Sequence, residues 1–189
     1  LIRSLLKTGP MGLLVLAAIS GSAPIIIILA LIACSAGDYF LSREGEKQFL
    51  FGLTAFLIGH LFYIAYFARS FSPNLLGNAQ VQQTGFLLLA LVAMVLLRIW
   101  PHLKELRIPI IIYGLTIAAM AFFARIADPG LTILAGIVLF MVSDILLAND
   151  KFMPLSKSIL RQALPYFIWV LYFTSQLLIV LGFTGNAFF

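Results

Sequence analysis

The 189 residues are 62% hydrophobic and only 10% charged, with a mean hydropathy of +1.10. Soluble domains contain about 25% charged residues, so this composition excludes a soluble globular domain. The net charge of +5 could indicate a protein that binds nucleic acid, but the positions of the basic residues along the chain explain the charge without such a partner.

Apolar runs of the length of membrane-spanning helices follow one another along the chain. A helix needs about 20 apolar residues to cross about 30 Å of hydrocarbon. The runs lie at about 5–20, 23–42, 49–68, 84–100, 107–127, 130–148 and 162–182, and the first is shorter than the others. They lack the alternation of membrane β-strands. The sequence therefore predicts an all-α, polytopic transmembrane helical bundle with seven visible spans, forming a single domain over residues 1–189.

The basic residues lie mainly in the loops at one end of the predicted bundle. Ten of the twelve are at this end: Arg3, Lys7, Arg43, Lys47, Arg98, Lys104, Arg107, Lys151, Lys157 and Arg161. Arg69 and Arg125 lie at the other end. Cytoplasmic loops of membrane proteins carry an excess of Lys and Arg. We therefore expect a multi-pass integral membrane protein, in the cytoplasmic membrane if bacterial, whose basic loops face the cytoplasm and which needs no nucleic-acid partner.

Two aspartates lie inside predicted spans. Asp38 belongs to "CSAGDYFL" (34–41) and Asp144 to "FMVSDILL" (140–147). An Asp at mid-span costs about 2.5–3.5 kcal/mol, so such residues usually face the bundle interior or a cavity. The two spans run in the same direction, and each aspartate lies roughly 6 Å from the basic end of its span. We expect the two carboxylates at matched height beneath the cytoplasmic face.

Other polar side chains are expected near this depth. Tyr113 and Tyr166 are predicted in the layer of the aspartates, and His60, Tyr63, Tyr172 and Gln176 below it. Together they predict a polar pocket that opens toward the cytoplasm above an apolar floor, which suits an amphiphile. Two alternatives stay open at this point. Asp38 could pair with Arg43 or Lys47, and His60 could be a packing residue.

The available side chains narrow the possible chemistry. A Schiff base would need a lysine inside the membrane, but the lysines lie in loops or at the entrance of a span. The GxSxG elbow of serine hydrolases is absent from the sequence. Zinc hydrolases use three protein ligands, whereas the chain has two histidines, one of them in a loop. What remains is a pair of carboxyl groups, of which one donates a proton and the other accepts one from water. Such a pair can cleave an acid-labile bond such as a vinyl ether.

Five sequence stretches occur together in order and spacing. They are "LLKTGPMGLLVLA" with Lys7 and Pro10, "CSAGDYFL", "FLFGLTAFLIGHLFYIAYF" (49–67), "GIVLFMVSDILLA" (136–148) and "YFTSQLLI" (172–179). Together they resemble the YhhN-like lysoplasmalogenase family of integral membrane proteins. The resemblance implies an eight-helix bundle, so we expect that the family's first helix is missing from this sequence. It also implies hydrolysis of the vinyl ether of lysoplasmalogens to a fatty aldehyde and a glycerophospho-base.

The resemblance also implies site residues. Asp38 and Asp144 match the family's motif aspartates, and the expected substrate-binding residues are His60, Tyr63, Tyr113, Tyr172, Gln176 and Lys7, the last with the phosphate. No cofactor and no metal are expected, and the predicted partners are a lysophospholipid substrate and membrane lipids. The sequence does not decide which aspartate is the acid, nor the oligomeric state. The alternatives are a proton- or cation-coupled transporter of a small solute or lipid, with the aspartates as ion sites, and a structural subunit.

Overall fold

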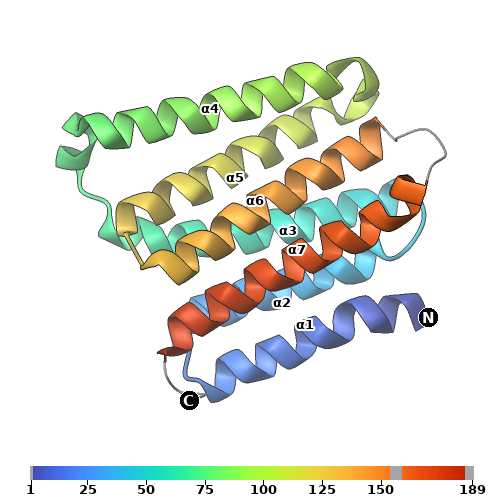
Figure 1. Cartoon of the computed structure of the whole chain (residues 1–189), viewed down its shortest axis with the longest axis horizontal. Helices are drawn as coiled ribbons and strands as arrows, with labels where there is room; N and C mark the ends of the chain where they lie inside the picture. Colours follow the sequence, from blue (N-terminus) through green and yellow to red (C-terminus); the bar gives the residue numbers. More distant parts are fainter. Residues whose placement is uncertain (1, 154–158, 186–189) are drawn as a thin grey trace.

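Seven α-helices run side by side in the computed structural model, which describes the backbone of residues 2–153 and 159–185 and the side chains of 8–153 and 162–185. The helices are α1 (Ile2–Ser20), α2 (Ile25–Leu41), α3 (Glu46–Phe67), α4 (Ala79–Ile99), α5 (Arg107–Ala127), α6 (Leu131–Phe152) and α7 (Ile159–Thr184). Consecutive helices run in opposite directions (Figure 1). The predicted all-helical bundle with seven helices is confirmed for the described residues.

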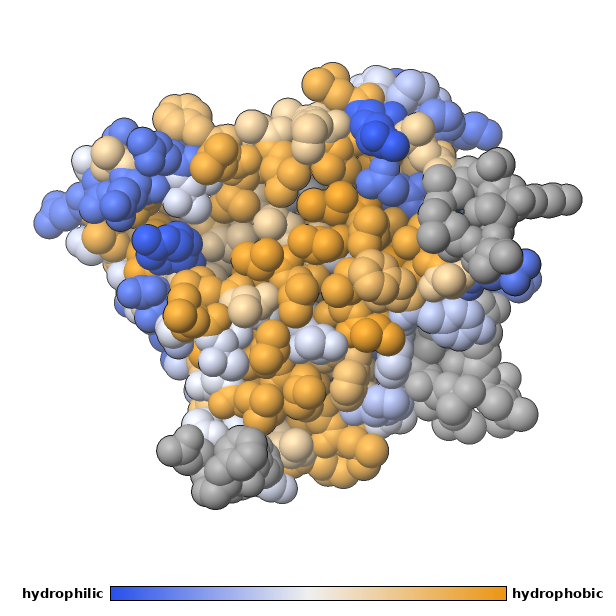
Figure 2. All heavy atoms as spheres, in the orientation of Figure 1, coloured by the Kyte–Doolittle hydropathy of each residue, from blue (hydrophilic) through white to orange (hydrophobic). Residues whose placement is uncertain are grey.

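Five of the described helical stretches are long and apolar enough to cross a membrane. They are Glu46–Ser70, Ala79–His102, Lys104–Ala127, Leu131–Phe152 and Gln162–Thr184. The first two predicted spans correspond to α1, in which the apolar stretch with described side chains is Thr8–Ser20, and to the shorter apolar helix α2, Ile25–Leu41. Figure 2 shows hydrophobic side chains across the middle of one face of the molecule and hydrophilic ones gathered toward its ends. This pattern is that of an integral membrane protein.

The connections alternate between two ends of the bundle. The start of α1, the α2–α3 and α4–α5 connections, the end of α6 and the start of α7 lie at one end (Figure 1). The α1–α2, α3–α4 and α5–α6 connections and the end of α7 lie at the other end. The first group of loops carries most of the basic residues, so we call this end of the molecule the basic end.

Two helix pairs pack most closely, α2 with α3 and α6 with α7. Glycine allows this approach in both pairs. A Cβ on Gly59 would lie 2.7 Å from the Cys34 sulfur, and one on Gly136 would lie 2.7 Å from the Ser175 carbonyl oxygen. Small residues let the backbones of membrane helices come together in this way. The α2–α3 pair carries Asp38 and the α6–α7 pair carries Asp144, so the packing of these pairs fixes where the two aspartates lie.

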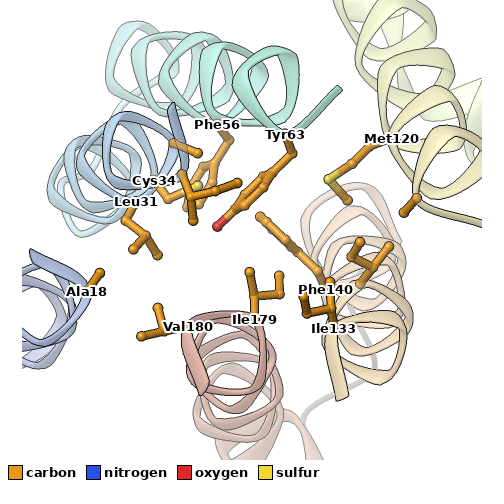
Figure 3. Close-up of a cluster of buried hydrophobic side chains, with 14 of the residues drawn as sticks. Ala18, Leu31, Cys34, Phe56, Tyr63, Met120, Ile133, Phe140, Ile179 and Val180 are labelled. Carbon is orange, nitrogen blue, oxygen red and sulfur yellow. The ribbon is translucent and has the colours of Figure 1, made fainter. Parts of the chain in front are cut away.

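The main hydrophobic core joins all of the helices except α4, and a smaller core around Ile99 joins α4 to α3, α5 and α6. The main core is largest between α2, α3, α6 and α7, where Figure 3 shows Tyr63, Phe140 and Ile179 extending into the space between these helices. These three side chains are fully or almost fully buried. In contrast, α4 has a single buried residue, Ile99. Helix α4 therefore lies at the edge of the bundle and leaves most of its surface for lipid.

Candidate active site

Asp38 and Asp144 line one cavity of about 340 Å³. The cavity lies between α2, α3, α6 and α7 toward the basic end, and its polar wall includes Ser143 and Tyr172. Both aspartates are nearly inaccessible, with exposed fractions of 5% for Asp38 and 8% for Asp144. The two carboxylates thus come from separate helix pairs and line the same hollow.

Two neighbouring helices, α5 and α3, contact the carboxylate of Asp144. The hydroxyl of Tyr113 on α5 donates a hydrogen bond to Oδ2 at 3.0 Å. Nε2 of His60 on α3 lies 3.5 Å from the same oxygen. The other ring nitrogen of His60, Nδ1, is 2.7 Å from the carbonyl oxygen of Phe56, one turn earlier on α3. The Asp144 side chain is therefore held by contacts from outside its own helix.

The surroundings of Asp38 are aromatic. The hydroxyl of Tyr172 interacts with its carboxylate, and the thiol of Cys34 is within electrostatic range of both aspartates. The Tyr172 ring packs edge-on against Phe56 and Phe140, with centroids 5.5 Å away in each case. These rings belong to the hydrophobic core, so they form an apolar floor that separates the cavity from the far half of the bundle.

Charged side chains lie at the mouth of the cavity. Arg43 and Glu44 come from the α2–α3 loop, and Asp150 and Lys151 from the last turn of α6. The Lys151 ammonium lies 4.7 Å from the centre of the Phe49 ring, which also lines the cavity. The mouth thus combines two cations with two anions. The side chain of Lys7, for which the sequence predicted a phosphate contact, lies outside the described residues.

A second, apolar cavity of about 80 Å³ adjoins the first. Its wall is formed mainly by α3, α4, α5 and α6, and includes Val92, Tyr113 and Gly114. Asp144 and Phe56 line both cavities. Asp144 therefore lies where a polar space and an apolar space meet. The sequence did not predict this cavity, because residues 85–97 of α4 are apolar on every side and give no signal of a wall.

The other predicted site residues separate into two groups. Tyr113 and Tyr172 line the cavities, whereas His60, Tyr63 and Gln176 are fully buried and are absent from both linings. Tyr63 donates a hydrogen bond to Gln176 Oε1 at 2.6 Å, and Gln176 Nε2 lies 3.9 Å from the Cys34 sulfur. Of this group, His60 alone contacts an aspartate, through the approach to Asp144 described above.

Tyr166 corrects one expectation. Its side chain is 76% exposed and lines neither cavity, so it does not belong to the polar pocket that the sequence predicted. A helix position alone gives depth but not direction, and Tyr166 lies on the outer face of α7. Among the described residues, no three His, Cys, Asp or Glu side chains come together in a way that could hold a metal ion.

Known proteins provide an independent comparison. The chain is 30% identical to the lysoplasmalogenase of Mycobacterium bovis over 164 residues, which cover 83% of this chain and 59% of that protein. The lysoplasmalogenase of Mycobacterium tuberculosis gives the same values. Lysoplasmalogenase TMEM86A of Bos taurus is 26% identical over 171 residues, covering 82% of this chain and 64% of that protein. The chain thus spans about three fifths of the length of these relatives.

No solved structure matches the chain significantly. The family comparison extends over almost the whole sequence, from residue 2 to residue 183. This range includes every described helix apart from the last residue of α7. The chain belongs to the YhhN family.

Proposed function

We propose that this protein hydrolyses the vinyl ether bond of lysoplasmalogen-like lysophospholipids, releasing a fatty aldehyde and a glycerophospho-base. The main observation in favour is that two buried aspartates from separate helix pairs line one cavity at the basic end. The relatives named lysoplasmalogenase support the same reaction. We also propose that the basic end faces the cytoplasm, because most of the basic residues in the described part of the chain lie there.

The reaction needs one proton donor and one proton acceptor. A carboxylic acid protonates the vinyl carbon farther from the ether oxygen, which produces an oxocarbenium ion. The second aspartate takes a proton from water as the hydroxyl adds to the cationic carbon, giving a hemiacetal. The hemiacetal then collapses to the aldehyde and the glycerol hydroxyl, and the proton movements restore both aspartates. General acid–base catalysis of this kind contributes about 10²–10⁴-fold to a rate.

The two adjoining cavities suit an amphiphilic substrate. The polar cavity would hold the glycerophosphate part, with Arg43 and Lys151 at its mouth in contact with the phosphate. Lys7 remains a further candidate for this contact. The apolar cavity would hold the first part of the hydrocarbon chain. The vinyl ether joins these two parts of the lipid, and Asp144 lies where the two cavities meet.

The remaining predicted site residues take different roles in this proposal. Tyr113 and Tyr172 face the cavities, so they would contact the reacting groups or their carboxylates directly. His60, Tyr63 and Gln176 line neither cavity, so they would act on the substrate only through other side chains. No step in this reaction requires a metal or an organic cofactor.

The test is turnover in deuterated water. Purified protein in lipid vesicles receives an alkenyl lysophospholipid, and a matched control receives the saturated alkyl ether of the same chain length and headgroup. We expect aldehyde from the alkenyl lipid alone, carrying one deuterium at carbon 2, because the acid protonates that carbon. Cleavage of the saturated ether, or aldehyde without deuterium at carbon 2, would contradict the proposed reaction.

Variants connect the activity to the aspartates. We expect Asp38→Asn and Asp144→Asn each to abolish most aldehyde release while the protein remains folded in detergent. Full activity in both variants would refute the acid–base roles. Proton-driven uptake of a solute into vesicles, with no turnover of any vinyl ether lipid, would instead favour the transporter.

A further inference from the structure

The two nitrogens of His60 have different partners, and this difference fixes where its protons lie. Nδ1 is 2.7 Å from the carbonyl oxygen of Phe56. A carbonyl oxygen can only accept a hydrogen bond, so Nδ1 carries a proton. In a neutral imidazole the other nitrogen, Nε2, then has no proton and presents a lone pair. The backbone of α3 thereby selects the ring state of His60.

The Nε2 atom of His60 is buried without a hydrogen bond of its own among the described residues, and the nearest charged group to it is a carboxylate. Nε2 lies 3.5 Å from Oδ2 of Asp144, and the side chains are 0% and 7% exposed. If Asp144 were ionised and His60 neutral, two lone pairs would oppose each other in a poorly solvated space. One additional proton removes this repulsion, whether it is closer to the carboxyl oxygen or to the ring. In both cases the pair has no net charge, which suits its depth in the bundle.

The neighbouring titratable groups do not supply this proton. Tyr113 on α5 already donates its hydroxyl hydrogen to Asp144 Oδ2. Cys34 and Asp38 on α2 are near enough to interact electrostatically, and Tyr172 on α7 interacts with Asp38. A negative charge on Asp38 would favour retention of the proton by the pair, because separating it would leave two carboxylates around one cavity. The cations that line this cavity are at its mouth, Arg43 and Lys151.

We propose that Asp144 and His60 share one proton, and that Asp144 gives this proton to the vinyl ether. Asp144 is thus the general acid, Asp38 is the base that takes a proton from water, and His60 is a positioning residue that keeps Asp144 protonated. This assignment rests on the proposed function. When the hemiacetal collapses, Asp38 returns its proton to the glycerol oxygen and the hemiacetal hydroxyl proton restores the Asp144–His60 pair, so the cycle balances.

The cavities support the same assignment. The carbon that receives the proton belongs to the hydrocarbon chain, and Asp144 lines both the apolar and the polar cavity. The base must meet water, and Asp38 lines the polar cavity alone. The acid, Asp144, therefore lies on the side of the lipid's hydrocarbon chain, and the base, Asp38, lies on the side of its headgroup.

The first test needs no substrate, because the chain has only two histidines. We label histidine with ¹⁵N and record nitrogen NMR spectra, with the exposed His102 as the internal reference. For wild-type His60 we expect a protonated Nδ1 and an Nε2 that shares a proton. In Asp144→Asn the Nε2 signal should become that of a bare ring nitrogen. A bare Nε2 in the wild type, or identical spectra in both proteins, would overturn the shared proton.

The second test measures turnover of the alkenyl lipid by His60→Gln, with His102→Gln as the matched control. We expect kcat to fall at least about tenfold, short of the roughly 10²–10⁴-fold loss expected for removing the acid itself, with KM changed less than twofold. The double variant His60→Gln, Asp144→Asn should be no slower than Asp144→Asn, because the two residues act as one unit. Full kcat in His60→Gln, or additive losses, would overturn the role of His60.

His60→Asn keeps the assignment testable if His60→Gln does not fold. Its shorter amide can still donate to the Phe56 carbonyl while nothing occupies the Nε2 position, so we expect the same loss of kcat. If the wild type turns over no vinyl ether lipid while the nitrogen spectra show the shared proton, the proposed function fails and the proton pair stands. If the wild type turns over the lipid but the nitrogen spectra show no shared proton, the proposed function stands and the proton pair fails.

Discussion

Two buried polar clusters lie one turn apart on α3 and differ in what they adjoin. His60 contacts Asp144, which lines two cavities. Tyr63 bonds to Gln176 inside the core and adjoins neither. The Tyr63–Gln176 bond is short, at 2.6 Å, whereas the His60–Asp144 approach is 3.5 Å. The first cluster has an acidic group beside open space, and the second is a closed contact that holds helices together.

Burial and depth alone therefore do not distinguish a polar residue beside a cavity from one enclosed by packing in a membrane bundle. The residue types in both clusters can donate and accept protons, and the sequence placed both in the same pocket. The cavity makes the difference, since a substrate can reach a carboxylate only where packing leaves room. The following substitutions are ordered from the largest expected effect to the smallest.

The largest effect is expected for Asp144→Asn. An amide cannot donate the catalytic proton, so aldehyde release should fall about 10²–10⁴-fold. The measurement is single-turnover release from an alkenyl lysophospholipid, with thermal unfolding in detergent as the control for folding. A variant that keeps more than a tenth of the wild-type rate would show that the cavity-facing cluster is no more catalytic than the closed one.

A smaller effect is expected for Tyr113→Phe. The substitution removes the hydrogen bond to Asp144 Oδ2, and hydrogen bonds to charged groups contribute about 1.5–3 kcal/mol. Once Asp144 has given up its proton, this donor stabilises the carboxylate, so kcat should fall about tenfold or more. Initial rates at saturating lipid provide the measurement. An unchanged kcat would separate Tyr113 from the reaction.

Gly114→Leu should change the preference of the protein for the length of the substrate's alkenyl chain. A Cβ on Gly114 would lie 3.3 Å from Val92 Cγ1, and both residues line the apolar cavity. A leucine narrows this space, so kcat/KM for long alkenyl chains should fall several-fold relative to short ones. Each methylene contributes about 0.8 kcal/mol in aqueous transfer. The matched control is Gly85→Leu on α4, which faces Phe122 and lies outside the cavity lining. Equal effects of the two variants would argue against chain binding there.

The smallest effect is expected for Tyr63→Phe. It breaks the bond to Gln176, and hydrogen bonds between membrane helices contribute about 0.6 kcal/mol on average and at most about 1.7 kcal/mol. The free energy of unfolding, measured in mixed detergent micelles, should fall by this amount. Turnover should fall less than in Tyr113→Phe. A greater loss of turnover than in Tyr113→Phe would remove the distinction between the two clusters.

The helix ends show where sequence patterns were sufficient and where they were not. The run predicted at 130–148 is a helix that continues to Phe152, and the added turn carries the charged residues Asp150 and Lys151. The run predicted from residue 84 begins at Ala79. There the Asn78 side chain accepts hydrogen bonds from the backbone of Gln80 and Val81 and caps the helix. A hydropathy pattern does not predict that the helices extend through these polar turns.

The candidate site was only partly accessible from the sequence. The two aspartates stood out because a carboxylate inside an apolar run is unfavourable and therefore rare. The apolar cavity beside Asp144 had no such signal, since its α4 wall has the composition of any lipid-facing helix. Tyr166 was misplaced because its position along α7 says nothing about which side of the helix it occupies.

The sequence by itself determined that this protein is a membrane bundle, where its helices lie and which acids are buried. These properties depend on hydropathy and on unfavourable charge in an apolar run, both of which are local. The tertiary structure decided which buried groups meet. Close packing of α2 on α3 and of α6 on α7, through glycines such as Gly59 and Gly136, sets the rotation of each helix. That rotation turns Asp38 and Asp144 into one cavity and encloses Tyr63 with Gln176.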